Sequence, residues 1–116
     1  MPSTTTYERG DIVLVPFPFT DLSSSKRRPA LIVSPDSFNK SNQDVVLVAI
    51  TSQIGPDTHA ITVDEHDFID GKLPKPSMIR PAKVFTIHSA LIVKRLCAVS
   101  PTKLQEVLKA IRKFYS

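Results

Sequence analysis

The chain has little of several residue types on which common kinds of site depend. Among 116 residues there are one cysteine, three glycines and no tryptophan. The single cysteine, Cys97, excludes an intramolecular disulfide, and its apolar surroundings at Leu96–Val99 predict a small buried side chain rather than a reactive thiol. A chain without disulfides is typical of a reducing compartment, so we expect a cytoplasmic protein. The glycines lie far apart, which excludes a glycine-rich phosphate-binding loop.

Long apolar runs and metal-ligand spacings are also missing. No stretch approaches the roughly 20 apolar residues that cross a bilayer. Met1–Gly10 is polar and has no apolar segment of the kind found in secretory signals, so we expect neither a leader nor a membrane partner. The three histidines lack the close spacing of a metal site: His59, His66 and His88. The sequence therefore predicts no metal and no cofactor.

What is present fits one small, modestly basic domain spanning residues 1–116. The hydrophobic share is 41%, which is ordinary for a chain with one core. The net charge is +4 and the isoelectric point is about 9.4, values compatible with a polyanionic partner. The most compact basic cluster is Lys26, Arg27 and Arg28, directly before Pro29.

Apolar and β-branched runs bounded by prolines and turn residues predict several short strands. We expect them at Asp11–Pro16, Pro29–Ser34, Asp44–Ser52, Thr58–Val63, Ser77–Ile87 with a bend near Pro81, and Leu91–Val99. Asp44–Ser52 is continuously apolar in its middle, which predicts a central strand buried on both faces. Short helical turns are expected at Pro35–Asn42, with Phe38 inward, and at Asp64–Gly71, closed by Gly71.

The end of the chain predicts an amphipathic helix. Ser100 is a good N-cap, and Pro101 is a good first helical residue. The apolar residues that follow fall on one helical face: Leu104, Val107, Leu108, Ile111 and Phe114. Several short strands and one such helix indicate a mainly β, α+β fold, a small antiparallel barrel with a C-terminal helix.

Arginines and hydroxyls near strand ends are the candidate functional residues. Arg28 opens the second strand, Thr51, Ser52 and Gln53 close the central strand, and Arg80 lies in a later strand. Two arginines with two hydroxyls suit a phosphodiester, because arginine pairs with phosphate oxygens and hydroxyls orient them. RNA also carries its own nucleophile, the 2′-hydroxyl.

Each of these residues also has a plain structural interpretation. Arg28 can be a solvated loop charge, Thr51 and Ser52 can cap a strand end, and Arg80 can pair with an acid at positions 64–70. Composition and spacing alone lead only to a basic barrel with a possible anion site.

Four motifs resemble MazF/PemK toxins, the ribonuclease half of bacterial type II toxin–antitoxin pairs. They are GDIVLVPFP at 10–18, KRRPALIVS at 26–34, VAITSQI at 48–54 and KPSMIRPAKVFTI at 75–87. The resemblance runs from about Tyr7 to the final helix. It implies an SH3-like barrel that forms a homodimer and a sequence-specific, metal-independent endoribonuclease acting on single-stranded RNA. The implied products carry a 2′,3′-cyclic phosphate and a 5′-hydroxyl.

The same resemblance implies roles for individual residues. Arg28 matches the arginine that contacts the scissile phosphate and is proposed to take part in proton transfer, and Thr51 matches the threonine proposed to stabilise the transition state. RNA contacts are expected from the remaining candidates: Lys26, Arg27, Ser52, Gln53 and Arg80. Some members place an acid shortly after the later arginine, where this chain has Pro81, Ala82 and Lys83, and some have a histidine in the first loop. In this chain Thr20–Arg28 holds no histidine and only one carboxylate, Asp21, so the general base stays open.

The resemblance also implies partners and leaves two alternatives. A cognate acidic antitoxin is expected to neutralise the toxin, and operator DNA is expected to be bound only through that antitoxin. The segments 91–99 and 101–114 are expected near the homodimer interface. One alternative is a CcdB-like toxin that inhibits DNA gyrase without cutting RNA, since fold does not decide function. The other is an RNA-binding relative that does not cleave.

Overall fold

The computed structural model describes residues 6–16 and 26–116. Most of the expected loop Thr20–Arg28, including Asp21, lies outside the described residues, whereas Lys26, Arg27 and Arg28 lie within them. In the part of the chain that is described, one sheet contains seven strands in the order β4-β6-β3-β2-β1-β7-β5. The strands are β1 (Asp11–Pro16), β2 (Arg27–Ile32), β3 (Asp44–Thr51), β4 (Ile61–Val63), β5 (Phe68–Asp70), β6 (Ser77–His88) and β7 (Lys94–Val99).

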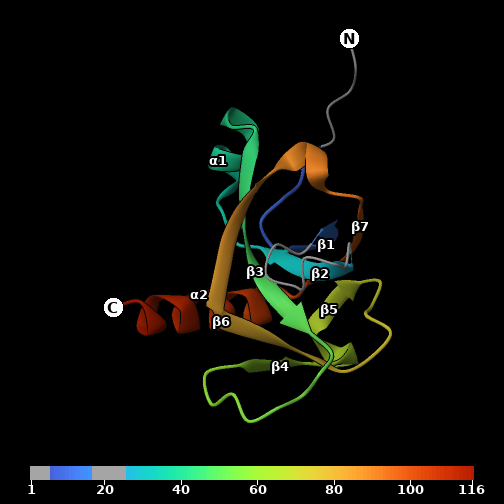
Figure 1. Cartoon of the computed structure of the whole chain (residues 1–116), viewed down its shortest axis with the longest axis vertical. Coiled ribbons are helices and arrows are strands. Elements are labelled where there is room, and N and C mark those ends of the chain that lie inside the picture. Colours follow the sequence, from blue (N-terminus) through green and yellow to red (C-terminus); the bar gives the residue numbers. More distant parts are fainter. Residues whose placement is uncertain (1–5, 17–25) are drawn as a thin grey trace.

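All neighbouring strands in this sheet pair antiparallel. The sheet curls into a half-barrel, and the C-terminal helix α2 (Pro101–Phe114) lies beside β6 (Figure 1). A short helix, α1 (Asp36–Ser41), precedes β3, and 3-10 turns η1 (Glu65–Asp67) and η2 (Ser89–Leu91) precede β5 and β7. The expected antiparallel α+β architecture with a C-terminal helix is confirmed.

Alternation along the strands divides the core into two clusters, one on each face of the sheet. The first cluster packs with α2 and includes Ile12, Leu31, Val48, Ile50, Ile79 and Val107. The second cluster includes Val13, Val15, Ala30, Leu47, Ala49 and Phe85. Asp44–Ser52 was expected to be buried on both faces, and β3 is buried on both from Leu47 to Ile50.

The C-terminal helix forms as its sequence predicts. The Ser100 side chain accepts a hydrogen bond from the Lys103 backbone nitrogen at 3.1 Å, and Pro101 occupies the first turn. This cap satisfies one of the backbone donors that have no partner inside a helix. Val107 is fully buried, and Leu104, Leu108 and Ile111 pack around it on the first core cluster.

The second strand differs from its expected bounds of Pro29–Ser34, because β2 runs from Arg27 to Ile32. Pro29 pairs with Leu14 of β1, whereas pairing with β3 starts only at Ala30. Proline is tolerated where one edge of the strand is open. Arg27 and Arg28 therefore belong to a strand and not to the preceding loop.

Three other expected elements are shorter than the sequence predicted. The strand expected at Thr58–Val63 is only Ile61–Val63, and the one expected at Leu91–Val99 starts at Lys94, after η2. The helical turn expected at Asp64–Gly71 is a 3-10 turn followed by β5, whose pairing with β7 holds 68–70 extended.

Gly71 and the α1 segment add two details. Gly71 has φ +62°, and a Cβ there would lie 2.9 Å from the Leu96 carbonyl oxygen, so glycine is required for this close approach. In α1 the buried residue is Asn39, whereas Phe38, expected inward, is only half-buried. The Asn39 side chain is held there because its amide donates to the Ser34 carbonyl at 3.1 Å.

The bend expected near Pro81 is confirmed. Val48 of β3 pairs with Val84, but the next residue, Ala49, pairs with Arg80. Residues 81–83 therefore form a bulge without partners on β3, a place where the missing N–H of proline costs no ladder hydrogen bond. The hydroxyl of Tyr115 donates to the Pro81 carbonyl at 2.9 Å, which ties the end of α2 to this bulge.

An arginine at the start of β7 joins three strands of the sheet. Arg95 Nε donates to Asp11 Oδ1 of β1 at 2.9 Å, and its Nη2 donates to Asp70 Oδ2 of β5 at 2.8 Å. The two carboxylates, Asp70 first, raise the pKa of Arg95. Asp11 is buried, and its other oxygen accepts from the Glu8 backbone nitrogen at 2.9 Å.

Nearby on the same strand, Cys97 is fully buried, and burial raises the pKa of its thiol to about 11.

Candidate functional site

Arg28 lies in β2 on the face of the sheet opposite α2. Ala30 and Ile32 of the same strand belong to the second core cluster, and alternation gives Arg28 the same face. Its partner on β1, Val15, also belongs to that cluster. The residue is half-buried, and its Nε atom is shielded from solvent. The guanidinium is thus held at the strand end by the sheet.

Thr51 is the last residue of β3 and lies two residues beyond the last residue of β3 that pairs with β2. The β2–β3 pairing places Ala30 opposite Ala49. Extending this antiparallel register by two residues places Arg28 opposite Thr51. Arg28 and Thr51 each lie two residues beyond the last pair of the β2–β3 ladder. By alternation, both side chains therefore lie on the face of the sheet that carries the second core cluster.

The threonine also shapes the turn that follows β3. Thr51 Oγ1 accepts a hydrogen bond from the Gln53 backbone nitrogen at 3.1 Å. This bond caps the end of the strand, as the plain structural interpretation of Thr51 predicted. Accepting this bond leaves the hydroxyl proton to donate elsewhere. Ser52 and Gln53 are exposed in the turn.

Arg80 lies on the same face, across β3 from β2. It pairs with Ala49, which lies between Ala30 of β2 and Arg80 of β6. Arg80, Thr51 and Arg28 therefore come from three adjacent strands and share one face of the sheet.

Arg80 is held by a carboxylate that the sequence analysis did not single out. Arg80 Nε donates to Asp57 Oδ2 at 3.0 Å, and the His59 backbone nitrogen donates to Asp57 Oδ1 at 2.9 Å. These two hydrogen bonds, that of His59 first, lower the pKa of Asp57. The expected pairing of Arg80 with an acid at 64–70 is therefore wrong. The sequence offered one indication of this partner for Arg80, namely a carboxylate in the turn at 55–57, shortly after Thr51.

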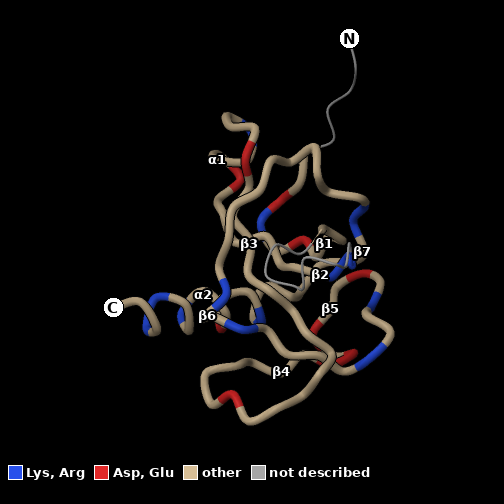
Figure 2. Tube along the Cα trace, viewed as in Figure 1, with Lys and Arg blue, Asp and Glu red and all other residues tan. Residues whose placement is uncertain are grey.

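The basic cluster before Pro29 does not act as one unit. Lys26 and Arg27 are exposed, and Arg27 pairs with Pro16. Alternation along β2 directs Arg27 to the face opposite Arg28. Figure 2 shows lysines and arginines distributed over several elements, including β6 and α2.

In the described segments, no group of three or more His, Cys, Asp or Glu side chains is placed to hold a metal ion. Nor is any helix of residues 6–16 and 26–116 long and apolar enough to span a membrane.

Comparison with known proteins finds one matching family and many solved structures with a similar fold. Residues 8–115 match the model of the family described as PemK-like, MazF-like toxin of type II toxin–antitoxin system. No curated protein matches the sequence.

The solved structures give the fold alone, because their sequence identities are low. A mycobacterial structure described as an endoribonuclease in complex with its cognate antitoxin is 20% identical, with a TM-score of 0.73 over 95% of this chain and 93% of that one. A MazE–MazF structure from Deinococcus radiodurans is 19% identical, with a TM-score of 0.77 over 96% of this chain and 97% of the other.

Proposed function

Since the chain belongs to the PemK-like, MazF-like toxins of type II toxin–antitoxin systems, we propose that it is a sequence-specific endoribonuclease that cuts single-stranded RNA without a metal ion. The observation that supports the proposal is that Arg28, Thr51 and Arg80 come from three neighbouring strands and share one face of the sheet by alternation. The endoribonuclease descriptions of the structural neighbours agree with it.

Arg28 and Thr51 are suited to stabilise a phosphorane-like transition state. The RNA 2′-oxygen attacks the adjacent phosphorus, the bond from phosphorus to the 5′-oxygen breaks, and a 2′,3′-cyclic phosphate forms. The 5′-oxygen leaves as a hydroxyl by taking up one proton, which balances the proton that the 2′-hydroxyl loses. Arg28 would neutralise the charge on the non-bridging oxygens, and the Thr51 hydroxyl would donate to one of them.

Neither Arg28 nor Asp57 is suited to take the proton of the 2′-hydroxyl. Arginine stays protonated near neutral pH, which makes Arg28 a poor general base. Asp57 is engaged by Arg80 and by the His59 backbone nitrogen, and its lowered pKa makes it a weak proton acceptor. We therefore give Asp57 the role of holding Arg80 in place.

The remaining candidates would bind the RNA on either side of the scissile phosphate. Arg80, Ser52 and Gln53 lie on or next to the strands that carry Arg28 and Thr51, so they would contact neighbouring nucleotides. Lys26 is exposed before β2 and would add a phosphate contact, whereas Arg27 would reach the RNA only around the edge of the sheet, given its face.

An antitoxin and a second copy of the chain complete the proposed assembly. Several structurally similar proteins are described with their antitoxins. We expect a cognate acidic antitoxin to cover Arg28 with carboxylates and to order on binding. A homodimer would place one Arg28 in each subunit, and operator DNA would be reached only through the antitoxin.

Incubating the pure protein with a long RNA in EDTA tests the central proposal. Discrete cuts should appear, and end mapping should find a cyclic phosphate upstream and a 5′-hydroxyl downstream. Loss of cutting in chelator with recovery in Mg²⁺ would overturn the metal-free mechanism. Intact RNA together with inhibited gyrase supercoiling would favour the CcdB-like alternative, and intact but bound RNA would favour a non-cleaving relative.

A further inference from the structure

Arg80 lies at a point where β6 loses its partners. In the described sheet, Ile79 pairs with both β3 and β4, whereas Arg80 pairs with β3 alone. The bulge at 81–83 that follows has no partner on either strand. An arginine side chain has many rotamers, so the direction of this guanidinium has to come from contacts outside the ladder.

The end of α2 holds the bulge by a hydrogen bond. The Tyr115 hydroxyl donates to the Pro81 carbonyl at 2.9 Å, directly after Arg80 in the chain. The Tyr115 backbone nitrogen in turn donates to the Ile111 carbonyl at 3.1 Å, and Ile111 packs on the first core cluster. The backbone that follows Arg80 is therefore joined to the core through one phenol group.

Phe114, the last residue of α2, reaches the same arginine by a second route. Its ring meets the His59 ring edge-on, with centroids 5.2 Å apart and an interplanar angle of 79°, a favourable aromatic geometry. The His59 backbone nitrogen donates to one oxygen of Asp57, and the other oxygen accepts from Arg80 Nε. Because both oxygens are engaged, the direction of the carboxylate follows the position of His59. Phe114 and Tyr115 also contact each other edge-on, with centroids 4.9 Å apart, which joins the two routes.

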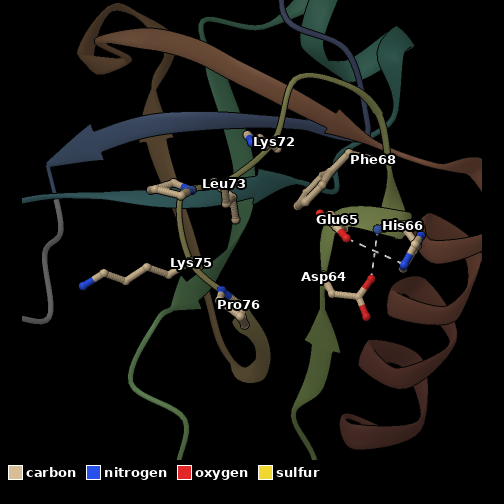
Figure 3. A pocket seen from close by; sticks show the side chains of 9 residues that line it. Asp64, Glu65, His66, Phe68, Lys72, Leu73, Lys75 and Pro76 are labelled. Atoms are coloured by element: carbon tan, nitrogen blue, oxygen red, sulfur yellow. Dashed lines mark hydrogen bonds and ion pairs between the residues drawn. The ribbon is translucent and has the colours of Figure 1, made fainter.

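The start of α2 is fixed to a different part of the sheet. The Lys103 ammonium donates to the Thr62 carbonyl at 3.1 Å, and the Ser100 backbone nitrogen donates to the Asp67 carbonyl at 2.7 Å. Figure 3 shows the turn η1, where His66 is labelled, next to this helix. A shift of the helix along its axis would break one of these sets of contacts, so its C-terminal end is a firm support for the bulge.

We propose that Phe114 and Tyr115 are positioning residues for the RNA site and act on it through Arg80. Two contacts from one helix end converge on this arginine, one on the backbone after it and one on its carboxylate partner. A guanidinium already held in its binding direction loses less conformational freedom when a phosphate arrives, so binding is tighter. The inference rests on the proposed function, since it requires that Arg80 contacts the RNA.

Binding of an RNA that cannot be cut tests the proposal. The probe is a short, fluorescently labelled oligoribonucleotide with 2′-O-methyl groups, which lacks the attacking hydroxyl. Tyr115→Phe keeps the ring and removes only the hydroxyl, and we expect the Kd to rise about three- to tenfold, the usual range for one lost hydrogen bond. In an Arg80→Ala background the same substitution should leave the Kd unchanged, because its effect requires the arginine.

Two further variants complete the binding series. Phe114→Leu removes the ring that meets His59 and should raise the Kd in the same direction as Tyr115→Phe. The matched control is Tyr7→Phe, which removes the hydroxyl of the chain's other tyrosine. Tyr7 lies near Val45, at the opposite end of β3 from Thr51, so this variant should bind like the wild type.

The NMR signal of the Arg80 Nε–Hε group gives a readout that loss of stability alone would not single out. Its hydrogen is protected by Asp57 in the wild type, and we expect faster exchange with water in Tyr115→Phe. The Nε–Hε group of Arg95, which donates to Asp11 at 2.9 Å, is the internal control and should keep its exchange rate. Faster exchange at both arginines would mark a general loosening and contradict the inference.

Separate outcomes distinguish this inference from the proposed function. If Tyr115→Phe binds the probe like the wild type while Arg80→Ala binds weakly, the positioning role is wrong and the ribonuclease proposal stands. An equal loss with and without Arg80 would mean that Tyr115 contacts the RNA itself, which also overturns the positioning role. If binding and exchange change as expected while natural RNA is not cut, the positioning role stands and cleavage fails. Wild-type affinity in Arg80→Ala would overturn the inference together with the RNA contact assigned to Arg80.

Discussion

At the scale of single residues, Arg28 and Thr51 are the side chains on which the proposed cleavage depends. We expect Arg28→Ala and Thr51→Ala each to lower kcat/KM on the order of 10²–10³, the usual cost of losing one transition-state donor. Arg28→Lys should also be poor, because a point charge cannot replace a planar fork of donors. Initial rates on a fluorogenic oligoribonucleotide measure the effect, and melting curves check folding. Arg27→Ala, on the opposite face, should lose much less, and near-normal rates for folded Arg28→Ala would remove the centre of the mechanism.

Asp57 gives a pH-dependent prediction, also at the residue scale. Its pKa is lowered in the folded protein from an ordinary 3.8, so the ionised carboxylate stabilises the fold above that value. The contribution is lost as the pH falls through the lowered pKa. The wild type should therefore melt above Asp57→Asn near neutral pH, and the two curves should converge in acid. Calorimetry over this range measures the gap, with Asp44→Asn at an exposed position as control. A gap that widens in acid would contradict the assignment.

At the scale of elements, the long segments could be predicted from sequence and the short ones could not. β1, β3, β6 and α2 carry enough apolar pattern and clear enough end signals to form as expected. β4 and β5 have three residues each and are held extended by β6 and β7. Arg80 was singled out from its strand, but its partner depends on the path of the loop after Thr51, which no local pattern encodes.

The N-cap of α2 gives a prediction for this helix. Ser100→Ala removes the acceptor of the Lys103 backbone nitrogen and should cost about 1 kcal/mol of the free energy of unfolding. Thr102→Ala, an exposed change in the first turn, is the matched control and should not destabilise the helix, because alanine has the higher helix propensity. Urea unfolding of the two variants measures the difference. Equal stability would mean that another group caps the helix.

At the scale of the whole molecule, exposed apolar side chains support the expected dimer. Leu91 is 51% exposed and Val93 is 41% exposed, both directly before β7. The segment 91–99 was expected near a symmetric interface, and two-fold dimers are the commonest assembly. We predict a dimer by sedimentation at micromolar concentration and a shift toward monomer in Leu91→Glu. A wild-type monomer at that concentration would exclude the dimer, and an unchanged Leu91→Glu dimer would place the interface elsewhere.

The contact between Asp11 and Arg95 also has a consequence for how the chain folds during synthesis. The two residues are 84 positions apart, and β1 lies between β2 and β7 in the sheet. Closing such a distant contact costs chain entropy before any packing compensates for it, so folding should be slow for a protein of this size. A nascent chain that has released only β1, β2 and β3 lacks Arg80 and four of the seven strands of the described sheet, including β7, the neighbour of β1. We therefore expect the toxin to become competent only after nearly all of it has left the ribosome, which gives an antitoxin made beforehand time to meet it.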